Sequence, residues 1–335
     1  MDAIILVGGM GTRLRPLTAD RHKSLLPICN RPVFDYLLEW AIEGGITRAV
    51  LAIGRANEDL AAAYPSGDWQ GLELLPVFET EPLQSGGAIR NAVSQAQVKG
   101  RFVVLNGDIL TDFSLAGMVA SHSTSGAELS IALHAEDDAR QYGVATVDGE
   151  SMIRQFVEKS PEPPSNLVNA GAWVFEPQLV ERIPAGAVRV EETLFPDLVE
   201  TGGRVLGYLF EGLWADIGTS SRYLSATLEM LDRGHPGLGD SIVIGEGATV
   251  QRSALGARSA VGAGARVLDS VLWENVTVGA HVSIQRSAIA NDASVGDGAQ
   301  LVGCVLGPRT RIAPGAVVPP GTTVEAEGEF GMSDD

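Results

Sequence analysis

The chain has 335 residues, of which 45% are hydrophobic and 20% charged, enough for a substantial buried core and typical of about two domains. Its 42 acidic and 24 basic residues give a net charge of −18. This charge argues against binding to a nucleic-acid polymer or an anionic membrane, because polyanions need a basic face. Without a transmembrane-length apolar run or a basic signal-peptide region, and with two widely spaced cysteines, the sequence predicts a cytoplasmic protein.

Strand-like and helix-like patterns alternate along the first two-thirds of the chain. Residues 3–7 (AIILV) form a continuous apolar run, typical of a central strand that is covered on both faces. Pro32 begins an amphipathic helix that ends at Gly44 and Gly45. Further strands are predicted over residues 49–53, 72–78, 102–105 and 129–133. This rhythm predicts an α/β fold with a layered sheet.

An internal repeat of 17 residues begins after the sequence pattern changes near residue 235. Apolar residues recur in three columns, spaced by 6, 6 and 5 residues within each period. The columns contain Ile244, Val261, Val278, Val295 and Ile312; Val250, Val267, Ile284, Leu301 and Val318; and Leu255, Leu272, Ile289 and Leu306. Three apolar corners per period predict stacked triangular coils, which resemble the left-handed parallel β-helix of hexapeptide-repeat proteins. A narrow prism also explains why Trp273 and Phe330 are the only aromatic residues after residue 240.

These patterns predict three regions: an α/β domain over residues 1–234, a β-helix over 235–324, and a mobile acidic tail over 325–335. Trp273 is interpreted as a contact between domains or subunits, or as a simple corner residue. His122, His134, His235 and His281 lack metal-ligand spacing and are expected to be exposed.

A glycine-rich loop follows the first strand, over residues 8–14 (GGMGTRL). Glycines allow backbone N–H groups to approach a phosphate closely, and Arg13 adds a fixed positive charge. The loop lacks the third glycine of a dinucleotide-binding motif and the terminal Gly-Lys-Ser/Thr of a P-loop. The loop is therefore a candidate phosphate site of another kind.

Residues 6–18 (LVGGMGTRLRPLT) and 23–28 (KSLLPI) closely resemble the signature of sugar-1-phosphate nucleotidyltransferases. The family's later motifs follow in order at residues 105–108 (LNGD), 156–159 (FVEK), 169–171 (NAG) and 214–219 (WADIGT). Many members also carry a C-terminal β-helix. The resemblance implies a Rossmann-like mixed sheet with helices on both faces, and an enzyme that transfers a nucleoside monophosphate from a nucleoside triphosphate (NTP) to a sugar 1-phosphate. The flat faces and stackable edges of the β-helix predict homo-oligomerisation through it.

The resemblance also implies the roles of individual residues. Arg13 and Lys23 would act on the triphosphate, and Asp108 and Asp216 would bind Mg²⁺. Nucleotide contacts are implied for Leu6, Gly8, Gly9, Gly11, Thr12, Glu81, Gly86 and Gly87, and sugar-phosphate contacts for Gly143, Glu158, Lys159 and Asn169. The chain has only three lysines, and two of them, Lys23 and Lys159, lie in these motifs. An ammonium group suits a point contact to phosphate.

The loop over residues 79–89 (ETEPLQSGGAI) looks most like the base-reading loop of mannose-1-phosphate guanylyltransferases. A carboxylate such as that of Glu81, helped by Glu79, can accept both adjacent N–H donors of guanine, which favours GTP. Glucose-1-phosphate thymidylyl- or uridylyltransfer stays open as an alternative.

Two other classes are weighed. One is a regulatory relative that binds sugar nucleotides without turnover, and the other is a β-helix acyltransferase with His281 as its base. Simpler structural roles also remain possible: Asp108 could cap the next helix, and Glu158 and Lys159 could form a surface ion pair.

Overall fold

A computed structural model describes residues 1–332 of the chain. It divides into two compact units: residues 1–10 with 34–215, and residues 11–33 with the chain from Asp216 onward. None of the helices among the described residues is long and apolar enough to cross a membrane.

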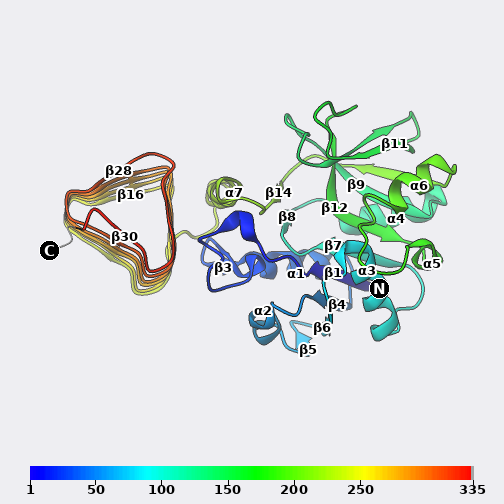
Figure 1. Ribbon diagram of the computed structural model, residues 1–335, viewed down its shortest axis with the longest axis horizontal. Helices are drawn as coiled ribbons and strands as arrows, with labels where there is room; N and C mark the ends of the chain where they lie inside the picture. The colour runs from blue at the N-terminus through cyan, green and yellow to red at the C-terminus, as the bar shows by residue number, and fades with distance from the viewer. Residues whose placement is uncertain (333–335) are drawn as a thin grey trace. The chain divides into compact units, whose positions relative to one another are not determined.

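The first unit is built on a ten-stranded sheet, whose main path runs β11-β10-β12-β7-β1-β4-β6-β5, with β9 beside β12 and β13 beside β9 (Figure 1). The strands are β1 (Asp2–Val7), β4 (Arg48–Ile53), β5 (Gly67–Trp69), β6 (Leu72–Phe78), β7 (Phe102–Asn106), β9 (Leu129–Ala135), β10 (Gly143–Val147), β11 (Ile153–Glu158), β12 (Leu167–Phe175) and β13 (Val205–Leu209). Strand β1 is parallel to β4 and β7, whereas β12 is antiparallel to β7 and β9. The predicted mixed sheet is confirmed.

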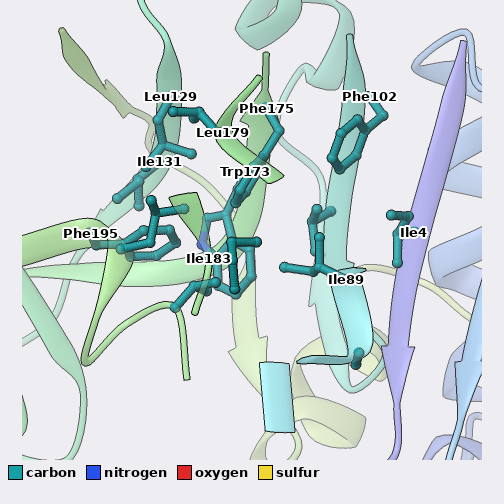
Figure 2. Close-up of a cluster of buried hydrophobic side chains, with 14 of the residues drawn as sticks. Ile4, Ile89, Phe102, Leu129, Ile131, Trp173, Phe175, Leu179, Ile183 and Phe195 are labelled. Atoms are coloured by element: carbon teal, nitrogen blue, oxygen red, sulfur yellow. The ribbon is translucent and has the colours of Figure 1, made fainter. Parts of the chain in front are cut away.

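Helices connect many of these strands: α1 (Val33–Glu43), α2 (Glu58–Ala63), α3 (Gln84–Ala96), α4 (Leu115–Ser125), α5 (Leu179–Arg182) and α6 (Leu194–Glu200). A separate two-stranded sheet pairs β8 (Ile109–Thr111) with β14 (Trp214–Asp216). Ile4 of β1 belongs to the core cluster in Figure 2, while Ala3 and Ile5, which point to the opposite face, are also fully buried. Both faces of β1 are therefore covered, as its apolar sequence predicts.

Aromatic side chains dominate the centre of this core. The rings of Phe102 and Phe175 stack with centroids 5.5 Å apart, and Trp173 meets Phe195 edge-on at 5.1 Å (Figure 2). All four side chains are at most 1% exposed. Because Trp173 and Phe175 lie on β12, the packing fixes the strand that also carries Asn169.

The second unit contains a short N-terminal segment, with the 3-10 turns η1 (Thr12–Leu14) and η2 (Lys23–Leu25) and the hairpin β2 (Pro27–Ile28) and β3 (Arg31–Pro32). It continues with α7 (Ser220–Asp232) and then a β-helix, whose triangular coils are seen end-on in Figure 1.

Three parallel sheets form the sides of the β-helix. The first contains β15 (Val243–Ile244), β18 (Ala260–Val261), β21 (Thr277–Val278), β24 (Ser294–Val295), β27 (Arg311–Ile312) and β30 (Glu329–Phe330). The second contains β16 (Thr249–Gln251), β19 (Arg266–Leu268), β22 (Ser283–Gln285), β25 (Gln300–Val302) and β28 (Val317–Val318), and the third β17 (Ala254–Leu255), β20 (Val271–Leu272), β23 (Ala288–Ile289), β26 (Val305–Leu306) and β29 (Thr323–Val324). The predicted β-helix is confirmed.

The strand register follows the sequence repeat. Val261 pairs with Val278, and Val278 pairs with Val295, so equivalent apolar residues stack on one another inside the prism. The corners are built by left-handed backbone, as at Arg258, Asn275 and Asp292, which have φ between 58° and 61°. The coil extends further than predicted, because Phe330 pairs with Ile312 inside the segment assigned to a mobile tail. The end of that predicted tail, residues 333–335, lies outside the described residues.

A column of small polar side chains runs through the β-helix interior at Ser253, Ser270, Ser287 and Cys304. Each serine Oγ accepts a hydrogen bond from the backbone N–H of the next member, at 3.0–3.1 Å. Each also donates to the carbonyl two residues earlier, as Ser270 does to Leu268 at 2.7 Å. Buried hydroxyls are therefore satisfied by bridging one coil to the next.

Candidate active site

Four parallel strands of the first unit, β7, β1, β4 and β6, end at one edge of the sheet. From β1 the chain continues to β4 and β6 on one side of the sheet, and it then returns to form β7 on the other side of β1. The direction in which successive strands are added therefore reverses at β1. Open α/β sheets bind ligands at the carboxyl ends of strands at such a point. Gly8 follows β1 and Asp108 follows β7, which places two predicted site residues at this edge.

The loop after β1 approaches its neighbour closely. A Cβ atom on Gly54 would lie 2.9 Å from the carbonyl oxygen of Gly8. The buried side chain of Asn57 donates from Nδ2 to the carbonyl of Val7 at 2.9 Å. Asn57 thus ties the loop after β4 to the end of β1, a role that no sequence motif indicated.

Glu79 lies immediately after β6 and is 5% exposed. One carboxylate oxygen is 3.3 Å from the position of a Cβ on Gly8, and the other accepts from Leu83 N at 3.1 Å. Burial raises the pKa of Glu79, and the hydrogen bond from Leu83 opposes that shift. Glu81, the predicted base contact, is exposed. The structure thus brings Glu79, of the two acids, next to the glycine loop.

Gly86 and Gly87 are buried in the first turn of α3. A Cβ on Gly86 would lie 2.9 Å from methyl groups of Ile183 and Val188, and one on Gly87 would lie 2.5 Å from the carbonyl oxygen of Gly186. Gly86 N also donates to the carbonyl of Val188 at 2.8 Å. These contacts give the glycine pair a packing role, because they allow α3 to approach residues 183–188 closely. This role is additional to the predicted contact with the nucleotide.

Asp108 lies in the turn between β7 and β8 and is 9% exposed. It does not cap the next helix, because Ser114 is the N-cap of α4 and its side chain accepts from Gly117 N. The preceding residue, Gly107, donates to the carbonyl of Leu6 at 3.0 Å, which joins the Asp108 turn to β1. The helix-capping alternative is therefore wrong.

Three of the four predicted sugar-phosphate residues lie on the antiparallel pair β10 and β11 or directly after it. Gly143 pairs with Glu158, and a Cβ on Gly143 would lie 2.6 Å from Glu158 Oε2. Burial raises the pKa of Glu158, and the neighbouring charge of Lys159 lowers it. Lys159 Nζ lies 3.5 Å from Glu158 Oε1, with the lysine side chain 53% exposed and the glutamate 16%. Glu158 and Lys159 do form an ion pair, but its acidic half is largely buried.

The amide of Asn169 is held in one orientation. Its Oδ1 accepts from Trp173 Nε1 at 2.8 Å and from Gly171 N at 3.1 Å. Only the oxygen of the amide can accept, so the two Nδ2–H donors point away from these groups. The buried Trp173 thereby positions a side chain with donors suited to sugar hydroxyls.

The second unit gathers Gly11, Thr18 and Lys23. Gly11 has a φ of +60°, and a Cβ on it would lie 3.1 Å from Lys23 Cβ and 3.2 Å from the Thr18 methyl group. Thr18 Oγ1 donates to the carbonyl of Gly11 at 2.9 Å. The left-handed glycine therefore lets the loop fold back on Lys23, two residues before Arg13.

Arg13 and Asp216 both adjoin Gly218 in this unit. A Cβ on Gly218 would lie 3.3 Å from Arg13 Nη2 and 3.0 Å from Asp216 Oδ2. Asp216 Oδ2 also accepts from Arg222 Nη1 at 2.8 Å, across the start of α7. A guanidinium and a carboxylate thus border the same small volume, and Arg222 is a partner that sequence reasoning missed.

The predicted Mg²⁺ ligands, Asp108 and Asp216, are judged by the oxygen atoms that they offer. Among residues 1–332, no cluster of three or more His, Cys, Asp or Glu side chains could hold a metal ion by itself. Mg²⁺ keeps several waters and needs only one or two carboxylates when substrate phosphates complete its shell. Asp108 and Asp216 each offer one carboxylate of the kind that Mg²⁺ prefers.

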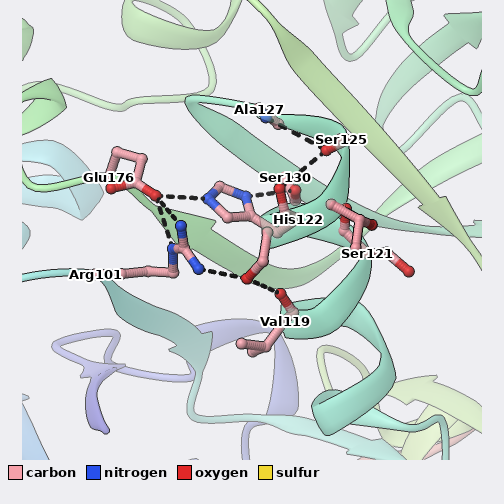
Figure 3. Close-up of polar contacts among 10 residues, drawn as sticks. Arg101, Val119, Ser121, His122, Ser125, Ala127, Ser130 and Glu176 are labelled. Carbon is pink, nitrogen blue, oxygen red and sulfur yellow. Dashed lines mark hydrogen bonds and ion pairs between the residues drawn. The ribbon is translucent and has the colours of Figure 1, made fainter.

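His122 departs from its predicted exposure. It is fully buried, with Nδ1 2.7 Å from Ser130 Oγ and Nε2 3.2 Å from a carboxylate oxygen of Glu176 (Figure 3). Arg101 Nε donates to the same carboxylate at 2.7 Å. Burial lowers the pKa of His122, and the hydrogen bond to Glu176 opposes it. Its partners Ser130 and Glu176 lie on β9 and directly after β12, so no local pattern around His122 indicated them.

Known families match both parts of the chain. The model of the nucleotidyl transferase family matches residues 2–233, and the model described as GlmU-like, C-terminal hexapeptide matches residues 238–304 and 263–333. The first match covers the mixed sheet with its glycine loop, and the second covers the β-helix. The chain belongs to the nucleotidyl transferase family, and the predicted class, sugar-1-phosphate nucleotidyltransferase, is confirmed.

Named relatives lie in one part of that family. A mannose-1-phosphate guanylyltransferase of Mycobacterium tuberculosis is 32% identical over 82% of this chain and 80% of its own. The catalytic subunit beta of the enzyme of that name from Drosophila pseudoobscura pseudoobscura is 35% identical over 67% of this chain and 60% of its own. A mannose-1-phosphate guanyltransferase beta-A of Xenopus laevis is 32% identical over 70% of this chain and 67% of its own.

Proposed function

We propose that the chain transfers GMP from GTP to mannose 1-phosphate, forming GDP-mannose and pyrophosphate. The observation that carries this proposal is the shared name of the relatives, one of which matches over 82% of the chain. The carboxylates of the loop after β6 add support, because one carboxylate can accept both N1–H and N2–H of guanine.

The reaction is an in-line displacement at phosphorus. An oxygen of the sugar phosphate attacks the α-phosphorus of the triphosphate, the α–β bridging P–O bond breaks, and its electrons leave with pyrophosphate. The attacking oxygen is already anionic, so no general base is needed. Catalysis then consists of bringing two polyanions together and stabilising charge in the transition state.

The cationic side chains supply this positioning. Arg13 would neutralise the triphosphate and the departing pyrophosphate, and Lys23 would hold the same phosphates. The turn at Gly11 supports this assignment, because it folds the loop that carries Arg13 back onto Lys23. Lys159 would contact the phosphate of the sugar. Asp108 and Asp216 would hold Mg²⁺, which when bound supplies a Lewis acid that offsets phosphate charge.

Glu158 and Asn169 would orient the sugar ring through its hydroxyl groups. Glu158 accepts and the Nδ2–H groups of Asn169 donate, so the pair can distinguish hydroxyl positions by geometry. Gly143 leaves the space above β10 open for the Glu158 side chain. For the base, we propose that Glu81 contacts guanine, while Glu79 fixes the loop through Leu83.

The test is pyrophosphate release from a panel of GTP, dTTP, UTP, CTP and ATP, each with mannose 1-phosphate and with glucose 1-phosphate. We expect the highest kcat/KM for GTP with mannose 1-phosphate. A clear preference for dTTP or UTP with glucose 1-phosphate would replace this proposal with the alternative substrates. Tight binding of GDP-mannose without turnover on any pair would instead indicate a regulatory relative.

We also propose that the β-helix mediates self-association. Its first coil exposes apolar side chains, with Val243 63% and Ile244 45% exposed, whereas the equivalent Val261 in the next coil is 2% exposed. Light scattering of the wild type and of Val243→Glu would test this. A wild-type oligomer whose mass is the same in Val243→Glu would argue against the proposal.

The buried, free thiols of Cys29 and Cys304 support a reducing compartment such as the cytoplasm.

A further inference from the structure

The loop that carries Arg13 and Lys23 belongs to the same compact unit as the β-helix. Residues 11–33 group with the chain from Asp216 onward, although the rest of the α/β unit separates them in sequence. Contacts within this unit therefore show which residues of the β-helix hold the loop in place.

One corner of the β-helix is lined by small residues except at a single coil. Its equivalent positions, at steps of 17, are Gly239, Gly256, Trp273, Ala290 and Gly307. The small members permit close approach, since a Cβ on Gly307 would lie 2.9 Å from Pro16 Cβ. The exception, Trp273, is only 1% exposed, so this corner is covered by other parts of the unit.

Trp273 contacts the loop on one side of Lys23 directly and on the other through Tyr223. Arg21 places its guanidinium carbon 4.7 Å from the centre of the indole ring. The indole Nε1 donates to Tyr223 Oη at 2.8 Å, and Tyr223 Oη donates to the carbonyl of Pro27 at 2.5 Å. Trp273 and Tyr223 are almost fully buried, and a hydrogen bond is electrostatically stronger in such a site than in water.

Two further contacts hold the segment against the rest of the unit. Arg309 Nη1 lies 3.5 Å from Asp20 Oδ2, and Asn30 Nδ2 donates to the carbonyl of Gly237 at 3.0 Å. Lys23 is therefore bracketed in sequence by anchored residues, Asp20 and Arg21 before it and Pro27 and Asn30 after it.

We propose that Trp273 is a positioning residue for the phosphate-binding loop, which it holds through Arg21 and through the Tyr223–Pro27 hydrogen bonds. Through this one corner the β-helix would then position the loop, in addition to its proposed role in assembly. This inference rests on the proposed function, because Lys23 is taken to bind the triphosphate.

A double-mutant cycle tests the proposal on the full-length protein. Trp273→Phe removes the Nε1 donor, and Tyr223→Phe removes the bridging hydroxyl while keeping the ring. Each is expected to raise KM for the triphosphate or lower kcat so that kcat/KM falls about tenfold, the loss of one or two buried hydrogen bonds. In a Lys23→Ala background the same substitutions should have little further effect, because they act through Lys23. Equal losses in both backgrounds would overturn the proposal.

Phe330→Leu is the matched control, because Phe330 is the other aromatic residue of the β-helix and lies in its last strand, paired with Ile312. It is expected to leave kcat/KM unchanged. A loss for Phe330→Leu equal to that for Trp273→Phe would show a general effect of β-helix stability and would contradict a specific role for Trp273.

Hydrogen–deuterium exchange separates this inference from the proposed function. We expect faster exchange within residues 11–33 in Trp273→Phe and Tyr223→Phe than in the wild type, whether or not the protein turns over any substrate. Unchanged exchange in this segment would reject the positioning role. Absence of wild-type turnover across the substrate panel would instead reject the proposed reaction.

Discussion

Glu158 Oε2 lies 2.6 Å from the point that a Cβ on Gly143 would occupy, across paired positions of β10 and β11. The carboxylate can lie over β10 only because residue 143 has no side chain. The same position is 2.8 Å from Phe156 Cζ, so a methyl group would be confined on two sides. This relationship makes Gly143 a determinant of where Glu158 points.

Gly143→Ala is therefore expected to displace Glu158 and raise KM for the sugar phosphate about tenfold or more, since small misplacements of positioning groups are costly. KM for the triphosphate should change little. Steady-state kinetics with each substrate varied would measure both values. Gly149→Ala is the control, because nothing lies within 4 Å of its Cβ position. Equal effects of the two substitutions would argue against the steric explanation.

Substitutions of the two acidic residues in the loop after β6 should have different effects, one on stability and the other on the choice of nucleotide. Glu79→Ala removes the acceptor for Leu83 N and is expected to lower the free energy of unfolding by about 1–3 kcal/mol. Glu81→Ala, an exposed change, should stay within about 0.5 kcal/mol and should reduce the preference for GTP over other triphosphates. Urea denaturation and the nucleotide panel measure the two effects. Retained GTP preference in Glu81→Ala would remove Glu81 as the base contact.

His122 should make stability fall in mild acid. Its pKa is lowered in the folded protein, mainly by burial, although Glu176 opposes the shift and the charge of Arg101 adds to it. The unfolded chain therefore takes up the proton first, and stability is lost as the pH falls through the unfolded value of about 6.5. We expect His122→Asn to show a smaller loss of unfolding free energy between pH 8 and pH 5.5 than the wild type. The control, His134→Asn, changes a partly exposed histidine, and equal pH dependence in all three proteins would contradict the assignment.

The polar column inside the β-helix should be sensitive to loss of a hydroxyl. Ser270→Ala leaves the buried N–H of Ser287 without its acceptor, so the free energy of unfolding should fall by about 1–3 kcal/mol. Ser283→Ala alters an exposed serine of β22 and should change it by less than about 0.5 kcal/mol. Thermal or chemical denaturation of both variants provides the comparison, and similar stabilities would show that the column contributes little.

The sequence by itself predicted the β-helix and the central strands well. A 17-residue repeat is a local pattern, and each coil contacts only its neighbours, so the register of Val261 on Val278 follows from periodicity. Most of strand β1 could be predicted because residues 3–7 are all apolar, as in a strand that is covered on both faces. Arg13, Lys23, Asp108 and Asp216 could be selected as candidates because their motifs occur in order along the chain.

Tertiary structure decided which polar side chains are buried and what they contact. Glu79 rather than Glu81 lies beside Gly8, and His122 lies in the interior with Glu176, because burial of a polar group depends on elements that are distant in sequence. The same reason applies to Trp273: its repeat position marked it as unusual, but its partners Arg21 and Tyr223 come from a loop and a helix outside the repeat. The sequence period determines the coil itself, whereas only the packing of segments distant in sequence determines which residues contact Trp273 at its corner.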